Sequence, residues 1–223
     1  MSLIEQQNVT SVELFPSPLM SYFWENSEDL NDELAKVILS KEKRDEGILT
    51  TNVGGWHSRK DLQSWNEPCV QVLLTRIMCL GHEMHYRFSG SKENELFSGW
   101  TIQAWANINR RDNHNKFHNH VRNMNLWSGV YYVNMGVRDE DGVSEARIVF
   151  ADQHQVIPKS GDGLVKRHYV VPKPGLMLLF PSSLGHRVEN HLGSSERITV
   201  AFNLRNDTLT TINYNIENSK VKP

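Results

Sequence analysis

Three histidines in two separate segments have the types and spacing of a metal site. His118 and His120 form a His-x-His pair in the polar segment 113–120, and His186 ends the apolar run at 175–186. Neutral imidazole binds divalent iron, zinc and copper well. Alternate residues of an extended strand point to one face, so the pair can converge on one ion. A third ligand from a distant strand would leave coordination positions open, as in catalytic sites.

A chain with ten histidines can also contain a His-x-His pair by chance, as a polar feature of a loop. Arg197 and Thr199 favour the metal site, because they follow His186 in a stretch that alternates like a strand. A buried arginine can bind a carboxylate through two parallel hydrogen bonds. Thr199 shares its face and can donate a hydroxyl hydrogen bond. The alternative for Arg197 is a surface salt bridge with Glu196 or Glu189.

Several segments, in order through most of the chain, resemble the non-heme iron(II)- and 2-oxoglutarate-dependent oxygenases, and more narrowly their bacterial and phage family. They are LFPSPL (14–19), TTNVGGWHSRKDL (50–62), His-x-His with LWSGVYYV (126–133), PKPGLMLLFPSSLGHRV (172–188) and ERITVAFNL (196–204). The resemblance implies Fe(II) as the metal, 2-oxoglutarate as cosubstrate and O2 as oxidant. The metal would be held by His118, His120 and His186, and Arg197 would hold the far carboxylate of 2-oxoglutarate.

Position 120 departs from the wider superfamily, whose usual ligands are His-x-Asp/Glu and a distal histidine. The narrower family has His-x-His here, which favours an all-histidine site with one negative charge fewer around the metal. A carboxylate from elsewhere could still complete the shell. Asp152 and Asp112 are the nearest candidates in sequence.

Strand parity adds further candidates for the cavity. Segment 100–110 has one apolar face and one largely polar face, and the polar face of such a strand can line a jelly-roll cavity. Tyr131 and Tyr132 point to opposite faces of one strand, so one of the two phenols can face the cavity. Asn203 shares the face of Arg197. The residues expected at the cosubstrate or substrate are Tyr132, Asn107, Asn203 and Thr199, with Trp105 and Gln103 as further lining candidates. NVGGW (52–56) reads either as a cover for the pocket or as a tight turn anchored by a buried tryptophan.

The elements that must position these residues change in character at about residue 100. Helical periodicity predicts amphipathic helices over 25–43 and 66–88. Short alternating stretches with Gly, Pro and Asn turns then predict strands, the last over 208–216. The fold class is therefore mainly β, a double-stranded β-helix (cupin-like jelly roll) with supporting N-terminal helices. We expect one domain over 1–223, with a helical cap over 1–98 and the β core over 99–217.

Composition narrows the class without fixing the function. A net charge of −2 and a pI near 6.6 give no support to nucleic-acid binding. The absence of a long apolar run or a signal-like N-terminus predicts a cytoplasmic protein with no membrane partner. Cys69 and Cys79 are expected to be reduced core thiols. His82 and His85 lack the H-E-x-x-H spacing and are expected at the surface or in a dimer contact.

The function that these predictions favour is hydroxylation of a small-molecule substrate, with release of succinate and CO2. Two alternatives stay open at this point. One is a metal-dependent cupin that works without 2-oxoglutarate, for which Arg197 would have no necessary use. The other is a non-catalytic, ligand-binding jelly roll with incidental histidines. A homodimer built through the N-terminal helices is a reasonable expectation.

Overall fold

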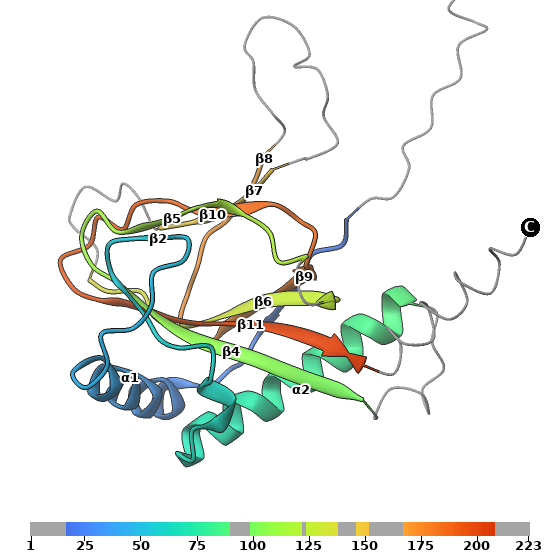
Figure 1. Cartoon of the computed structure of the whole chain (residues 1–223), viewed down its shortest axis with the longest axis horizontal. Helices are drawn as coiled ribbons and strands as arrows, with labels where there is room; N and C mark the ends of the chain where they lie inside the picture. The colour runs from blue at the N-terminus through green and yellow to red at the C-terminus, as the bar shows by residue number, and fades with distance from the viewer. Residues whose placement is uncertain (1–16, 90–98, 122–123, 138–145, 152–166, 208–223) are drawn as a thin grey trace, which may run out of the picture.

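Two antiparallel β-sheets form the body of the protein, and both helices lie on the outer face of the larger sheet (Figure 1). The computed structural model describes residues 17–89, 99–121, 124–137, 146–151 and 167–207. The predicted strand over 208–216 lies outside these ranges. The mainly-β jelly roll with supporting helices is confirmed.

The larger sheet has six strands and the smaller has five. In spatial order the larger sheet contains β1 (Met20–Phe23), β9 (Leu176–Pro181), β6 (Trp127–Asn134), β11 (Arg197–Asn206), β4 (Trp100–Asn109) and β3 (Trp56–His57). The smaller sheet contains β2 (Asn52–Val53), β5 (His114–His118), β10 (His186–Val188), β7 (Ile148–Ala151) and β8 (Arg167–Val170). The described part of the first 98 residues thus supplies three strands as well as α1 and α2, and the division into a cap and a core stays a prediction.

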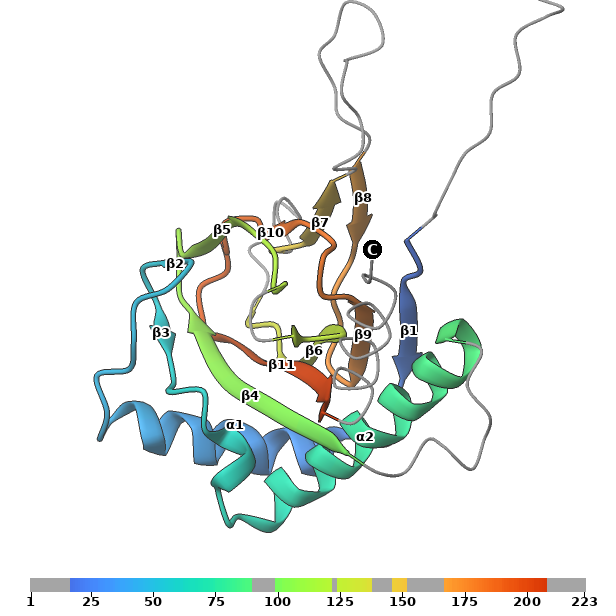
Figure 2. The ribbon, with the colours of Figure 1, turned by 45° about the vertical axis from the view of Figure 1, so that its right-hand side comes forward.

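Both predicted helices form. α1 (Glu28–Glu42) has acidic residues in its first turn and a lysine in its last, which suits the helix dipole. α2 (Pro68–Ser89) begins with the proline that is tolerated in a first turn. Neither of these two helices combines the length and the apolar character needed to cross a bilayer. Figure 2 shows both helices running beneath β4 and β11.

Alternate side chains of β4 point to opposite faces of the larger sheet, and the two faces have different surroundings. Ala104, Ala106 and Ile108 are completely buried in the core that the larger sheet shares with the helices. Trp105 and Asn107 point the other way, into the space between the sheets. The helices therefore bury one face of the larger sheet, and its other face is left to build a cavity.

Truncating the core between helix and sheet is expected to destabilise the protein. Leu73 is fully buried in α2, so Leu73→Ala should lower the free energy of unfolding by about 2–5 kcal/mol. Leu49→Ala is the matched control, because that side chain is 87% exposed. Urea denaturation of both variants checks this, and equal losses would contradict the assignment of the core.

The turn between β2 and β3 carries the chain from the smaller sheet to the larger one. Gly54 and Gly55 have φ of 68° and 67°, and a Cβ on Gly55 would lie 2.4 Å from the Ile108 carbonyl oxygen. The indole of Trp56 donates a hydrogen bond to the Asp45 carbonyl at 2.7 Å. The reading as a tight turn anchored by a buried tryptophan is therefore confirmed. The turn is followed by His57, which lines the cavity, whereas residues 52–56 are not among the lining residues, so their role as a cover stays a prediction.

Two expectations outside the site need correction. Cys69 and Cys79 are both free, but Cys79 is exposed and only Cys69 is a core thiol. His85 is not at the surface, because it is 6% exposed and packs edge-on against Trp100 with ring centroids 5.1 Å apart. Its position in α2 puts it over the large aromatic side chain at the start of β4.

Candidate active site

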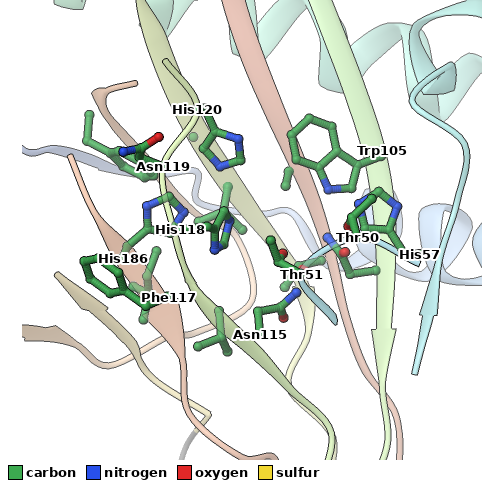
Figure 3. A pocket seen from close by; sticks show the side chains of 18 of the residues that line it. Thr50, Thr51, His57, Trp105, Asn115, Phe117, His118, Asn119, His120 and His186 are labelled. Atoms are coloured by element: carbon green, nitrogen blue, oxygen red, sulfur yellow. The ribbon is translucent and has the colours of Figure 1, made fainter. Parts of the chain in front are cut away.

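Three imidazoles converge in the space between the two sheets. The ring centroids of His118 and His186 are 4.4 Å apart, and those of His120 lie 4.9 and 5.2 Å from them. The nitrogen atoms that could bind a metal all lie within 4.8 Å of one another. Figure 3 shows the three rings together on one side of the pocket. The predicted cluster therefore exists in the fold.

The backbone brings the three rings together in two ways. His118 and His186 are directly opposite each other in the β5–β10 pair. His120 lies beyond β5, which ends at His118, so the expectation that one strand carries both histidines is wrong. Its amide donates to the Ser182 carbonyl at 2.8 Å, and the Asn125 side chain donates to its carbonyl at 3.0 Å. These two hydrogen bonds fix the position of His120 in the loop, where no strand pairing is present to do so.

Hydrogen bonds and burial prepare the rings as neutral ligands. Nδ1 of His118 lies 2.7 Å from the Lys116 carbonyl, and Nδ1 of His186 lies 2.9 Å from that of Leu184. Carbonyl acceptors require Nδ1–H, which leaves Nε2 free for a metal. Burial, reinforced by the neighbouring rings, lowers the pKa of His120 to about 2 and that of His186 to about 3. The donor set therefore fits a divalent metal ion.

No carboxylate joins this cluster in the described part of the chain. Asp112 is exposed and sits in a turn with φ of 68°. Asp152 lies outside the described residues.

The metal-free protein is expected to lose stability in acid because of these rings. The pKa of His186 falls from 6.5 to about 3 on folding, so below pH 6.5 the unfolded chain takes up a proton that the folded chain refuses. Between pH 7.5 and pH 5 this one group should cost about 2 kcal/mol. Urea unfolding of the metal-free protein at both pH values, with His186→Asn beside it, measures the difference. Equal acid sensitivity of the two proteins would contradict the shift.

Arg197 is a buried cation facing the same cavity. It is 2% exposed and lines the pocket from the start of β11. Its Nη1 donates to Asn109 Oδ1 at 3.3 Å, whereas its Nε has no hydrogen-bond partner. Burial lowers the pKa of Arg197. A planar fork with an unused donor is suited to receive a carboxylate from a ligand.

The alternative of a surface salt bridge for Arg197 does not hold. Glu196 instead lies 3.6 Å from the guanidinium of Arg110. Glu189 accepts from Arg147 at 2.8 Å.

Three of the other predicted contacts gather beside Arg197. Thr199 on β11 is paired with Asn107 on β4 and with Tyr132 on β6, so the three form one row across the larger sheet. All three are buried and line the pocket. The Tyr132 hydroxyl has no hydrogen-bond partner, and burial raises its pKa to about 12. It is therefore a protonated donor. Tyr131 points to the opposite face, where its hydroxyl donates to Asn31 at 2.7 Å.

Two predicted lining residues fall outside the cavity. Asn203 has the expected parity, but it lies further along β11 and its amide oxygen accepts a hydrogen bond from Ser128 at 2.8 Å. Gln103, two residues before Trp105 on β4, is not among the lining side chains either. Parity gave the correct face, but it could not tell where along the strand the cavity ends.

The pocket has a volume of about 600 Å³, which is within the range of sites for small ligands. Across the pocket from the cluster of His118, His120 and His186, the lining residues are Thr50, Thr51, His57 and Trp105 (Figure 3). His57 stacks on Trp105 with centroids 5.6 Å apart, and the Lys60 ammonium lies 4.9 Å from the centre of the same indole. The sequence reading did not assign a role to Lys60, although it lies in the GGWHSRKDL stretch beside the predicted turn.

The arrangement combines a metal-binding cluster with an anion-binding end. Three neutral ligands on one side of an ion leave positions open for a bidentate ligand and a further small molecule. Arg197, Thr199 and Tyr132 provide one cation and two hydroxyl groups on the facing sheet. A ligand with one chelating end and one carboxylate end would match both parts.

Residues 103–203 match the model of a protein family described as "Putative 2OG-Fe(II) oxygenase". This range contains all three histidines, Arg197 and the row around Thr199. A search of curated proteins found no match.

Solved structures similar to this chain share its fold at low sequence identity. A prolyl-4-hydroxylase from Pseudomonas putida is 17% identical, with a TM-score of 0.58, and the match covers 84% of this chain and 92% of that one. A prolyl hydroxylase from Trichoplax adhaerens, in complex with a hypoxia inducible factor peptide, is 12% identical, with a TM-score of 0.58 and coverage of 87% and 86%. The alpha-ketoglutarate-dependent epimerase SnoN from nogalamycin biosynthesis is 11% identical, with a TM-score of 0.61 and coverage of 86% and 79%.

Proposed function

We propose that this protein, whose residues 103–203 match the model of the 2OG-Fe(II) oxygenase family, hydroxylates a small-molecule substrate with iron(II), 2-oxoglutarate and O2. Oxygenase activity with these cofactors is what the family implies. The small-molecule substrate, hydroxylation as the reaction and the roles given to single residues are our proposals.

One observation carries the proposal. Arg197 is a buried guanidinium with an unpartnered Nε, and it opens into the pocket that also contains the three imidazoles. A buried cation without a carboxylate partner is costly to keep, so a ligand that supplies the carboxylate would satisfy it. A cupin that works without 2-oxoglutarate has no such use for this side chain.

Each residue has a distinct part in this account. His118 and His186 would hold the metal through Nε2, because their Nδ1 bonds to carbonyls fix the ring orientations, and His120 would be the third ligand. Arg197 would pair with the far carboxylate of 2-oxoglutarate, with Thr199 and Tyr132 donating to its oxygens and Asn107 beside them. The iron centre supplies the oxidation chemistry, in which 2-oxoglutarate becomes succinate and CO2 as the substrate is oxidised.

Enclosure is the second contribution of the chain. Phe180 packs its ring edge-on against His186 with centroids 4.9 Å apart, and Trp105 lies 5.8 Å from His120. Phe180 thus helps to bury His186, and Trp105 shields part of His120, and less water around the ligands strengthens electrostatic interactions within the site. The family implies a small-molecule or peptide substrate, and we favour the small molecule because the pocket volume is about 600 Å³.

The test is formation of succinate from 2-oxoglutarate by the purified protein supplied with iron(II) and O2. Slow uncoupled turnover is expected without substrate, and it should stop when iron or O2 is withheld. Retention of iron with no turnover of 2-oxoglutarate would favour the cupin alternative. Failure to retain iron, cobalt or manganese would favour a non-catalytic jelly roll.

A further inference from the structure

No acidic side chain occurs among the described residues that line the pocket. Its ionisable members are four histidines, Tyr132 and two cations, Arg197 and Lys60. Both fixed charges of the described pocket wall, those of Arg197 and Lys60, are therefore positive.

Lys60 is the second cation of the pocket and lies beside Trp105. Its ammonium is held 4.9 Å above the centre of the Trp105 ring by a cation–π contact, and the Trp105 ring lies 5.8 Å from that of His120. No carboxylate of the described residues lies within salt-bridge distance of Lys60, and partial burial lowers its pKa. The ammonium is thus placed near the metal ligands without a counterion among these residues.

With the metal and 2-oxoglutarate bound, the site would keep an excess of positive charge. A divalent ion bound by three neutral imidazoles keeps both of its positive charges, unlike an ion bound by a carboxylate ligand. Arg197 and Lys60 add one positive charge each. The two carboxylates of 2-oxoglutarate balance only part of this total, and a neutral substrate would leave the rest without a counterion in a partly enclosed space.

We propose that the substrate of this site carries a carboxylate, which pairs with Lys60 on the side of the pocket formed by Trp105, Thr50 and Thr51. The inference rests on the proposed function and names the substrate class for the same site. A carboxylate matches a single ammonium with neighbouring hydroxyl groups, whereas phosphate sites more often use bidentate arginines or helix N-termini. Lys60 acts as a residue that determines specificity.

The experiment compares acids with their neutral amides. The probes are N-acetyl-L-phenylalanine, N-acetyl-L-leucine and 3-phenylpropionate, each beside its amide, with phenyl phosphate as a fourth anion. Dissociation constants are measured by saturation-transfer NMR on the protein loaded with zinc(II) and saturating 2-oxoglutarate, and again on the protein as purified. The variants are Lys60→Met, Lys60→Arg and, as matched control, Lys36→Met on the exposed surface of α1.

For at least one pair, the acid is expected to bind about tenfold more tightly than the amide, the usual size of a charge-assisted hydrogen bond. Lys60→Met should abolish this preference, Lys60→Arg should keep most of it, and Lys36→Met should not change it. A panel without any Lys60-dependent preference for an acid would overturn the proposal. So would an acid that competes with 2-oxoglutarate, or tighter Lys60-dependent binding of phenyl phosphate than of any acid.

The two hypotheses fail in different ways. If the protein does not bind metal or 2-oxoglutarate, the proposed function fails, and the acid–amide comparison can still be read on the protein as purified. If both bind but acids and amides bind alike, the proposed function stands and the substrate class is wrong.

Discussion

Replacing Arg197 by methionine is expected to weaken 2-oxoglutarate binding by about 100-fold while leaving metal binding intact, because breaking one partner of a buried charge pair costs a few kcal/mol. Methionine keeps most of the side-chain volume and removes the fork. Since Arg197 has no carboxylate partner among the described residues, its loss should not lower the free energy of unfolding of the ligand-free protein. Arg197→Met should therefore lower the affinity for 2-oxoglutarate without lowering the free energy of unfolding.

Calorimetric titration of 2-oxoglutarate into the zinc(II)-loaded protein, with urea denaturation in parallel, measures both quantities. Arg197→Lys should recover only part of the affinity, because an ammonium keeps the charge without the two-pronged geometry. Arg110→Met is the matched control. Arg110 directly follows Asn109, the residue opposite Arg197 in the β11–β4 pair, but its guanidinium bonds to Glu42 at the surface. Equal affinity of Arg197→Met and the native protein would remove Arg197 from the site.

Removing His186 is expected to abolish stoichiometric iron binding, with a loss of affinity of at least about 100-fold, since two remaining ligands cannot hold the ion at a three-ligand site. His186→Ala takes away the only ligand on β10, whereas His118 and His120 belong to one segment of chain. Uncoupled succinate formation should disappear with the metal.

Equilibrium dialysis with cobalt(II), followed by metal analysis, measures this effect. His114→Ala is the control, because His114 lies on the same β5 as His118 but belongs neither to the cluster nor to the pocket lining. If His186→Ala retains one cobalt per chain while His118→Ala does not, a ligand outside the proposed set completes the site.

The metal cluster could be predicted because the His-x-His pair comes before one apolar stretch that is typical of a strand, and His186 follows another. The apolar run before His186 and the alternating stretch from Arg197 both became strands in the expected place. Parity also assigned Tyr132, Thr199 and Asn107 to the cavity face, and the register then placed these three in one row. Local periodicity carries this information because it repeats at every second residue.

Other features depend on contacts between distant segments, which periodicity does not encode. His120 joins the cluster through a loop held by Ser182, although β5 ends two residues earlier. Asn203 has the correct parity but lies beyond the cavity, paired with Ser128. Lys60 reaches the pocket only because η2 (Leu62–Ser64) and the turn before it lie against β4, where Trp105 receives the ammonium.

The measurement that tests the account most directly is an anaerobic titration of the metal-free protein with iron(II) and then with 2-oxoglutarate. The keto oxygen and one oxygen of the adjacent carboxylate should bind the iron together and produce a weak visible absorption band. The account predicts one such band per chain, absent in His186→Ala and requiring about 100-fold more 2-oxoglutarate in Arg197→Met. Stoichiometric iron binding with no band at any concentration of 2-oxoglutarate would contradict it.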